Sequence, residues 1–290
     1  MIQHYLVGEH LFAIEAEQKH FDVLSNYAPF MTDELGRTRV FIIHVKNDAI
    51  PSGEGWEHVH TDTSDDDMPR IEMYQLPHRW LFRVSVMRDG DIKCAMRCSE
   101  DWSEVELFLE PGYERFAIDN AAMLTYAFCT MHRQTLLFHS SVTIRDGKAY
   151  MFLGHSGTGK STHSRQWLET FPEAWLLNDD NPVVRTFDDG SVTVYGSPWS
   201  GKTPCYKNEQ APVQALVQLA QAPHNEIKRL RMSQAYPFIL ASVSGLKILP
   251  QAMDAIYESI ALLLERTPVF KLECLPDHDA AQLCAQTCSL

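Results

Sequence analysis

The sequence has no run of 18 or more apolar residues, so we expect no membrane-spanning helix. Its N-terminus also lacks the basic and then apolar order of a secretory signal peptide. Basic residues are scarce: 25 Lys and Arg stand against 38 Asp and Glu, giving a formal net charge of −13. Because nucleic-acid phosphates repel such a surface, this balance disfavours a general nucleic-acid-binding protein. We therefore expect neither a membrane nor a nucleic-acid partner.

A disulfide framework and a zinc knuckle are missing as well. The seven cysteines are odd in number and scattered. Cys94 and Cys98, like Cys284 and Cys288, are four residues apart, which is not the C-x-x-C spacing. Reduced thiols in a cytoplasmic protein are the simplest interpretation. With 290 residues, 45% of them hydrophobic, the chain can bury one large core or two smaller ones.

One motif determines the class of chemistry, the P-loop pattern G-x-x-x-x-G-K-[ST]. It is formed by Gly154, His155, Ser156, Gly157, Thr158, Gly159, Lys160 and Ser161. In such a loop backbone N–H groups surround nucleotide phosphates, the lysine reaches the β- and γ-phosphates, and the hydroxyl binds Mg²⁺. Residues 149–153 are strand-like, and residues 161–168 have the pattern of a helix whose N-terminus faces the phosphates. We expect ATP and Mg²⁺ as ligands, with Thr162 among the nucleotide-binding residues.

The segment before the motif predicts a second site residue. Residues 135–144 form a predicted strand, and Asp146-Gly147 is favoured in two-residue hairpin turns. If Arg145 faces Lys148, continuing the ladder places His139 opposite Gly154, at the mouth of the phosphate loop. The alternative is a strand histidine that is merely hydrogen-bonded.

Paired acids follow one helix later. Residues 174–177 read as a short buried strand, and Asp179 and Asp180 come directly after it. A phosphoryl-transfer site needs carboxylates to hold Mg²⁺ and to accept the proton of the attacking hydroxyl. The alternative is an ordinary acidic turn, which is how we interpret Asp188-Asp189-Gly190.

This order of elements over residues 135 to 185 resembles the catalytic core of HPr kinase/phosphorylase and, more distantly, ATP-dependent phosphoenolpyruvate carboxykinase. The resemblance implies an α/β P-loop core with a mixed sheet, in which Gly154 to Ser161 binds ATP phosphates and Mg²⁺. It implies that one of Asp179 and Asp180 helps hold the metal while the other acts as base. His139 matches the family's active-site histidine. A homo-oligomer is expected by the same analogy.

The flanking regions give coarser expectations. We predict a β-rich N-terminal domain over 1–115 and the nucleotide-binding domain over 116–290. Residues 39–45 and 80–86 look like strands, and 51–69 looks like a solvated polar loop. That loop carries His58, His60 and the acids 65–67, for which a metal site is the less favoured interpretation.

After the acidic pair, the turn-rich stretch 195–204 indicates a functional loop. Lys202 and Lys207 are candidates for contact with the transferred phosphate or the acceptor, or else are solvated lysines. Arg185, Arg229 or Arg231 is a weaker candidate for neutralising charge in the transition state. Helices are expected over 235–243, over 253–266 and from about 277, and a strand over 269–274.

Taken together, these patterns predict a kinase that transfers the γ-phosphate of ATP to a hydroxyl of a protein serine, a peptide or a small molecule. Two alternatives stay open: a carboxykinase-like or phosphorolytic enzyme, and a nucleotide-binding sensor without turnover. The sequence leaves the acceptor unidentified.

Overall fold

The computed structural model describes residues 1–62, 69–201, 203–245, 247 and 249–289. The chain divides into two compact units, one ending at Cys129 and the other beginning at Thr130. The boundary therefore lies just before the last residue of the helix α2 (Glu114–Thr130), whereas the sequence placed it at 115. Each unit has a mixed sheet, so the expectation of a mixed α/β chain is confirmed at this level.

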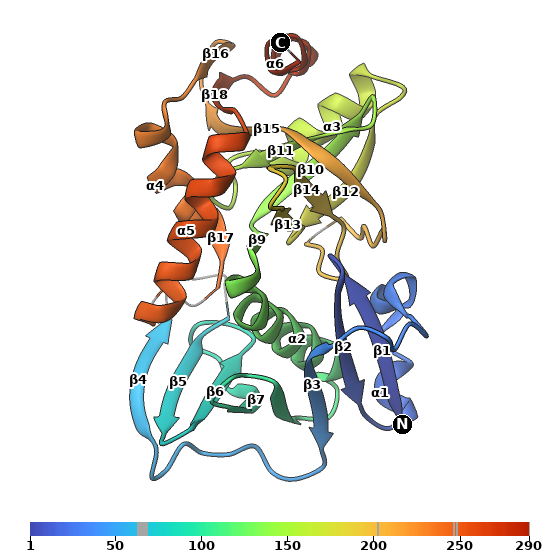
Figure 1. Ribbon diagram of the computed structural model, residues 1–290, viewed down its shortest axis with the longest axis vertical. Helices are drawn as coiled ribbons and strands as arrows, with labels where there is room; N and C mark the ends of the chain where they lie inside the picture. Colours follow the sequence, from blue (N-terminus) through green and yellow to red (C-terminus); the bar gives the residue numbers. More distant parts are fainter. Residues whose placement is uncertain (63–68, 202, 246, 248, 290) are drawn as a thin grey trace. The chain divides into compact units, whose positions relative to one another are not determined.

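The first unit is built on an eight-stranded sheet with the order β1-β2-β3-β8-β7-β6-β5-β4 (Figure 1). Its strands are β1 (Ile2–Val7), β2 (His10–Glu15), β3 (Arg39–Lys46), β4 (Glu57–Asp62), β5 (Ile71–Leu76), β6 (Arg79–Ser85), β7 (Ile92–Ser99) and β8 (Glu104–Leu109). The pairs β2–β3 and β3–β8 are parallel, and the others are antiparallel. Before β3 come α1 (Gln18–Phe21) and the 3₁₀ helix η1 (Ser25–Phe30).

The amphipathic helix α2 covers the apolar face of this sheet. The Tyr126 hydroxyl donates to the Val7 carbonyl, and Phe128 stacks on Trp102 with ring centroids 3.8 Å apart. Charged side chains pair across neighbouring strands, as in the Arg97–Glu106 contact of 2.7 Å between β7 and β8. The alternation of apolar and charged positions along the strands therefore places one face in the core.

The expectation of a loop over 51–69 is wrong for part of that stretch, because β4 lies within it. His58 and His60 belong to β4 and pair with β5. The His58 imidazole bonds the Thr61 hydroxyl at 2.8 Å. Every residue of β4 is exposed or half-buried, so its sequence lacks the alternation of apolar and polar residues that would predict a strand. The segment is a strand because it pairs with β5. The acids 65–67 lie outside the described residues.

The second unit holds a ten-stranded sheet whose main order is β12-β10-β11-β15-β14-β13-β9-β17. Its strands are β9 (Thr135–Phe138), β10 (Ser140–Arg145), β11 (Lys148–Leu153), β12 (Trp175–Asp180), β13 (Val183–Thr186), β14 (Val192–Tyr195), β15 (Gln210–Gln221), β16 (Glu226–Arg229), β17 (Val243–Ser244) and β18 (Val269–Cys274). Strand β18 pairs with β15 and β16. The helices are η2 (Met131–Arg133), α3 (Lys160–Thr170), α4 (Met232–Ser242), α5 (Pro250–Arg266) and α6 (His278–Cys288).

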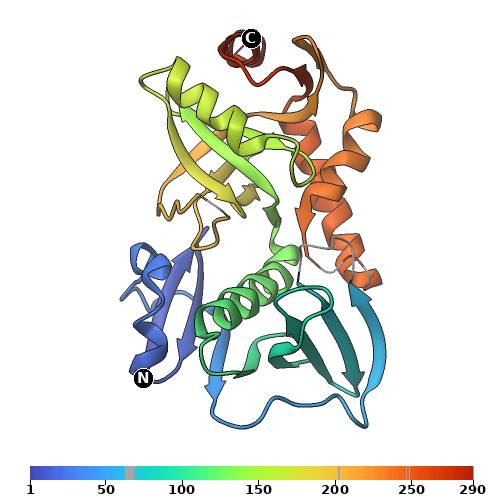
Figure 2. The same cartoon turned by 180° about the vertical axis from the view of Figure 1, so that it is seen from behind.

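Helices cover both faces of this sheet (Figures 1 and 2). Alternate residues of β11 enter different cores, because successive side chains of a strand point to opposite faces. Met151 packs with Ile239 of α4 and Ile260 of α5. Phe152 packs with Trp167 of α3 and with the apolar side of α6. This three-layer arrangement explains why residues 149–153 of β11 are all buried. The helix α3, which follows the loop after β11, packs on one face of the sheet.

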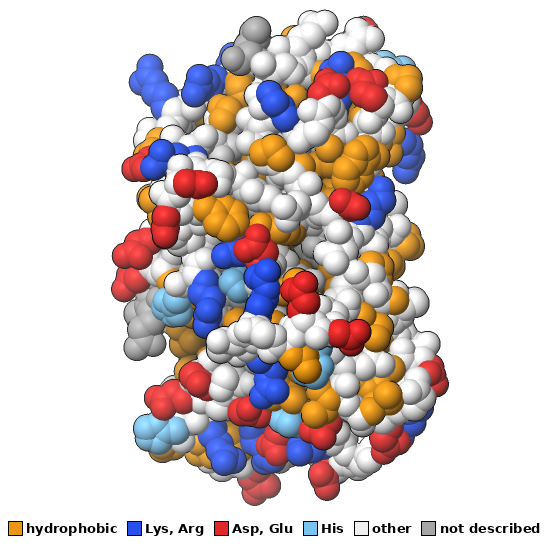
Figure 3. All heavy atoms as spheres, turned by 45° about the vertical axis from the view of Figure 1, so that its right-hand side comes forward, with side chains coloured by type: hydrophobic (Ala, Val, Ile, Leu, Met, Phe, Trp, Pro, Cys, Tyr) orange, Lys and Arg blue, Asp and Glu red, His pale blue; other side chains and the backbone are white. Residues whose placement is uncertain are grey.

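Acidic and basic side chains are interspersed on the face of the molecule in Figure 3. None of the described helices is both long and apolar enough to cross a membrane.

Candidate active site

The P-loop connects β11 to α3, as the sequence predicts. Gly157 and Gly159 have φ angles of 80° and 102°, in the left-handed region that a β-carbon disfavours. Thr158 closes the turn by donating from its hydroxyl and its backbone N–H to the His155 carbonyl. Lys160 opens α3, with Gly159 as the preceding cap residue. The free N–H groups at the start of α3 therefore lie at the loop, where an anion is stabilised.

The predicted hairpin is also present. Arg145 pairs with Lys148, and both turn residues, Asp146 and Gly147, have positive φ angles of 51° and 71°. The ladder continues to Ser140, which pairs with Leu153. His139 comes directly before this ladder; its backbone N–H donates to the Ser242 carbonyl, and its side chain contacts the Lys160 ammonium, which also donates to the Gly154 carbonyl.

The predicted strand 135–144 is, however, interrupted at His139. β9 pairs with β13 and β17, whereas β10 pairs with β11 and β12. His139 is therefore the residue at which the chain changes partners. Ser140 of β10 lies opposite Leu153 of β11 and opposite Asp180 of β12. This antiparallel arrangement brings His139, the P-loop and the acidic pair to one end of three adjacent strands.

The first polar chain of the site joins Lys160, His139 and Asp180. The Lys160 ammonium lies 2.9 Å from His139 Nε2 and donates to the carbonyls of Gly154 and His155. An ammonium group only donates, so Nε2 accepts and the ring proton is at Nδ1. Nδ1 lies 3.1 Å from Asp180 Oδ1. Burial lowers the pKa of Lys160, and the nearby carboxylates of Asp180 and Asp179 partly oppose this shift.

The second polar contact joins the two predicted metal ligands. The Ser161 hydroxyl donates to Asp179 Oδ1 at 3.0 Å. Asp179 is 6% exposed, whereas the Asp180 side chain is 30% exposed. The two neighbouring acids therefore occupy different environments: Asp179 faces the start of α3, and Asp180 faces His139. We call His139, Lys160, Ser161, Asp179 and Asp180 the P-loop cluster.

A buried amide that the sequence reading did not select supports the acidic pair. Asn178 donates to the Ser197 hydroxyl and to the Trp199 carbonyl, both at 3.2 Å. Its Oδ1 accepts from the Asp180 backbone N–H at 3.0 Å. The sequence does give a signal for this role, because Asn178 is a polar residue that directly follows the apolar residues of β12. A buried amide needs hydrogen-bond partners, so it holds the segments around it in place.

The loop after β14 approaches the acids closely. The Gly201 backbone N–H donates to the Asp179 carbonyl at 2.9 Å. A β-carbon at Gly201 would lie 3.1 Å from that oxygen and 3.4 Å from Asp180 Cβ. The expectation that this loop is part of the site is consistent with these contacts, and glycine permits the approach.

The two substrate candidates are placed differently. Lys202 lies outside the described residues. The Lys207 ammonium lies 4.6 Å from the centre of the Trp175 ring, in a cation–π contact. Trp175 begins β12 and Asp180 ends it, so Lys207 is at the opposite end of the strand from the P-loop cluster. Arg185 stacks on Phe187, and Arg229 lies on β16.

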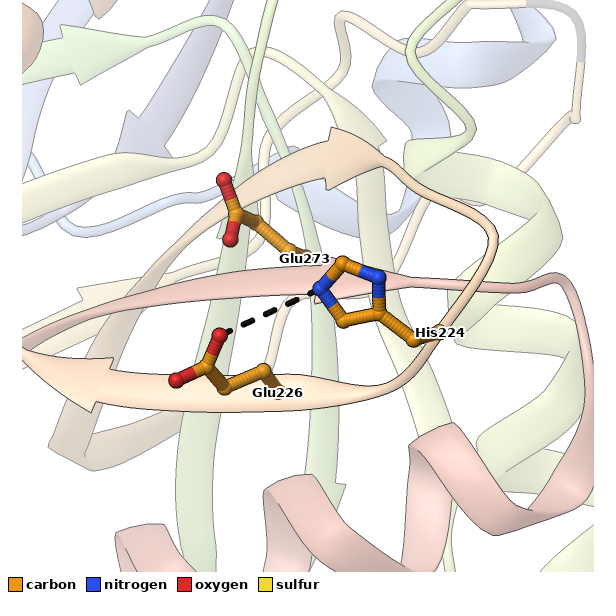
Figure 4. Close-up of side chains that lie close together, drawn as sticks. All are labelled: His224, Glu226 and Glu273. Atoms are coloured by element: carbon orange, nitrogen blue, oxygen red, sulfur yellow. Dashed lines mark ion pairs between the residues drawn. The ribbon is translucent and has the colours of Figure 1, made fainter.

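A second group of ionisable side chains lies on β16, β18 and the turn before β16. His224, Glu226 and Glu273 offer ligand atoms within 4.8 Å of one another (Figure 4). We call them the edge-strand cluster. Both acids already have cationic partners: Lys228 lies 2.9 Å from Glu226, and Lys271 lies 2.7 Å from Glu273. Each ion pair joins two residues of the same strand, β16 or β18, and these pairs account for the grouping without a metal.

Comparison with known proteins adds no relative: neither a scan of protein-family models nor a search of curated proteins finds a match to this chain.

Proposed function

We propose that this protein is an ATP-dependent phosphotransferase that transfers the γ-phosphate to a hydroxyl group of an acceptor. The observation that carries the proposal is the convergence, at one end of three strands, of a P-loop lysine, the serine that follows it and two carboxylates. Phosphoryl transfer depends mainly on positioning and charge stabilisation, and it needs each of these groups. A protein that only binds nucleotides does not need a second carboxylate beside the first.

Ser161 and Asp179 form the proposed Mg²⁺ site. Their oxygens already lie 3.0 Å apart, and hydroxyl and carboxylate oxygens are ligands that Mg²⁺ prefers. The donor set therefore fits the ion. When bound, Mg²⁺ neutralises charge on the β- and γ-phosphates. Asp179 is nearly buried, which suits a metal ligand better than a group that meets a diffusing acceptor.

Lys160 is the proposed phosphate ligand. Its ammonium now contacts a neutral imidazole and two carbonyls, and the ion pairs among the described residues include none for it. Phosphate oxygens carry negative charge and are stronger acceptors than these groups. Partial burial strengthens the attraction, because less water screens it.

Asp180 is the proposed base. In the reaction, the acceptor oxygen forms a bond to the γ-phosphorus, the bond from that phosphorus to the β–γ bridging oxygen breaks, and ADP leaves. The acceptor proton passes to the Asp180 carboxylate. His139 Nδ1–H and the Asn181 amide, at 2.9 Å, hold this carboxylate in orientation. His139 thus contacts Lys160 through Nε2 and Asp180 through Nδ1, and in this proposal it positions both charged groups.

The test measures ADP formation from ATP and Mg²⁺, with and without a panel of serine peptides and hydroxyl-bearing metabolites, and the phosphate added to each acceptor by mass spectrometry. Acceptor-dependent ADP formation supports the proposal. In Asp179→Asn the Mg²⁺ dependence should move to higher concentration, whereas Asp180→Asn should keep the wild-type dependence at a lower rate.

Tight ATP binding with no turnover for any acceptor would instead support the nucleotide-sensor alternative. Failure to bind ATP at all would overturn the proposal.

A further inference from the structure

A cavity of about 680 Å³ lies beside the P-loop, within the second unit. It is bordered by residues 157–159, Thr162 and His163, by Leu219 and 221–222 at the end of β15, and by 274–276 after β18. Binding sites for small organic molecules have volumes in this range, with apolar walls and a few placed polar groups. The P-loop glycines and Thr162 form one wall, so the cavity continues from the proposed phosphate site.

His163 is the polar group that the proposed chemistry leaves unexplained. It is 4% exposed and lines the cavity. The Trp167 indole N–H donates to its Nε2 at 3.1 Å. An indole nitrogen only donates, so Nε2 accepts and the ring carries its proton at Nδ1. Among the described residues no acceptor is recorded for this N–H.

The ring is held in place as well as in one tautomer. Phe152 meets His163 edge-to-face with centroids 4.7 Å apart, and Trp167 is fully buried. Burial lowers the pKa of His163 to about 4, so the imidazole is neutral at physiological pH. The residue therefore gives the cavity wall a fixed, uncharged hydrogen-bond donor.

The remaining walls suit a flat heteroaromatic ring. Leu219, Ala222, Leu275 and Pro276 are apolar, and burial raises the pKa of the Cys274 thiol to about 11, so that it is uncharged. Gln221 is oriented by its amide N–H, which donates to the Gly157 carbonyl at 3.1 Å. Its Oε1 is then available as an acceptor near the P-loop.

We propose that this cavity binds the base of the nucleotide and that His163 is a specificity-determining residue, its Nδ1–H donating to a ring nitrogen of the base. The inference rests on the proposed function, because it assumes that the P-loop holds the triphosphate. Phosphate affinity and base affinity are then separate properties of two adjoining surfaces.

The test compares the affinities of ATP and inorganic tripolyphosphate, with Mg²⁺ at pH 7.5, by calorimetry. Tripolyphosphate reports the P-loop alone, whereas ATP reports both surfaces. His163→Leu should weaken ATP binding about five- to tenfold, the worth of one hydrogen bond, and leave tripolyphosphate binding unchanged. His163→Gln should recover ATP affinity, because its oxygen can accept from Trp167 while its amide donates. Ala222→Phe, which fills the cavity from another wall, should lose ATP selectivity in the same way.

ATP analogues in which one ring nitrogen is replaced by carbon identify the acceptor. One analogue should bind wild type as weakly as ATP binds His163→Leu, and should lose nothing further in the variant. Equal losses for ATP and tripolyphosphate, or no loss for either, would overturn the assignment of His163 while nucleotide binding stands. If the wild type binds neither ligand, the proposed function fails and this inference fails with it.

Discussion

The P-loop cluster and the edge-strand cluster contain the same kinds of side chain, histidine with carboxylates and lysine close by, but the chain holds them differently. His139 and Asp180 have side chains 38% and 30% exposed, against 57% and 45% for His224 and Glu226. The first cluster collects residues from the β9–β10 junction, the start of α3 and the end of β12. The second collects neighbours on two paired strands and the turn before them.

The pairing of the lysines differs most. Lys228 and Lys271 neutralise the acids of the edge-strand cluster directly. Lys160 instead contacts neutral acceptors, and His139 stands between it and Asp180. In the edge-strand cluster the carboxylates are paired with lysines of the same strands. In the P-loop cluster the Lys160 ammonium contacts uncharged groups, so in our proposal it can pair with an anionic ligand. The residue types alone do not distinguish the P-loop cluster from the edge-strand cluster. The two clusters differ in which charged groups already have a partner of opposite charge.

The largest expected effect is on catalysis. Asp180→Asn keeps the shape of the side chain and removes the proton acceptor, so the acceptor-dependent rate should fall roughly 10²-fold or more. ATP affinity should change much less, since Lys160 and the loop remain. ADP formation and calorimetry measure the two quantities. Glu273→Gln is the matched control, and it should leave both unchanged. A near-normal rate in Asp180→Asn would mean that the acidic pair is only structural.

The second comparison sets buried His163 against exposed His224. The pKa of His163 is lowered from 6.5 to about 4, so between these values the unfolded chain binds more protons than the folded chain. The stabilising effect of the neutral ring is complete above pH 6.5 and is lost as pH falls towards 4, by about 3 kcal/mol in the limit. Urea unfolding of wild type and His163→Leu from pH 8 to 4 should show a shallower acid loss in the variant. His224→Leu should retain the wild-type slope, and parallel curves for wild type and His163→Leu would contradict the buried, neutral state.

A third effect concerns binding. Lys160→Ala removes the only lysine of the phosphate loop, and hydrogen bonds to charged groups contribute about 1.5–3 kcal/mol. ATP affinity should therefore fall on the order of 10- to 100-fold, measured by calorimetry with Mg²⁺. Lys228→Ala, a change of the same kind beside the edge-strand cluster, should bind ATP as wild type does. Equal ATP affinity in wild type and Lys160→Ala would remove the basis for phosphate binding at this loop.

Local signals predicted much of the second unit. The P-loop, the Asp146-Gly147 turn and β18 (269–274) were predictable because each depends on neighbours in sequence. The position of His139 followed from counting along a hairpin. The break at His139 did not, because it depends on distant partners: β9 pairs with β13 and β17, whereas β10 pairs with β12, and all three lie more than 30 residues downstream.

Other features depended on tertiary contacts. The long strand β15 contains Pro212, which argues against a strand when read from sequence, yet Pro212 lies where β15 pairs only with β14. The proposed donor role of His163 was also hidden, because it follows from the Trp167 contact and from the cavity that His163 lines. A histidine in a helix gives no such information by itself.

The smallest expected effect is the response of the edge-strand cluster to metal. A histidine with two carboxylates is a reasonable Zn²⁺ ligand set by type, so a bound ion would raise the melting temperature as Zn²⁺ is added. We expect no such rise, because an ion would have to displace Lys228 and Lys271 from carboxylates that are well solvated. Thermal unfolding with increasing Zn²⁺, in wild type and in the double variant Glu226→Gln with Glu273→Gln, measures this directly. The two proteins should melt within about 2 °C of each other at every Zn²⁺ concentration. A Zn²⁺-dependent rise in melting temperature in wild type alone would show that the edge-strand cluster binds the ion. Burial and lysine pairing would then no longer distinguish a ligand-binding site from an exposed group of ion pairs.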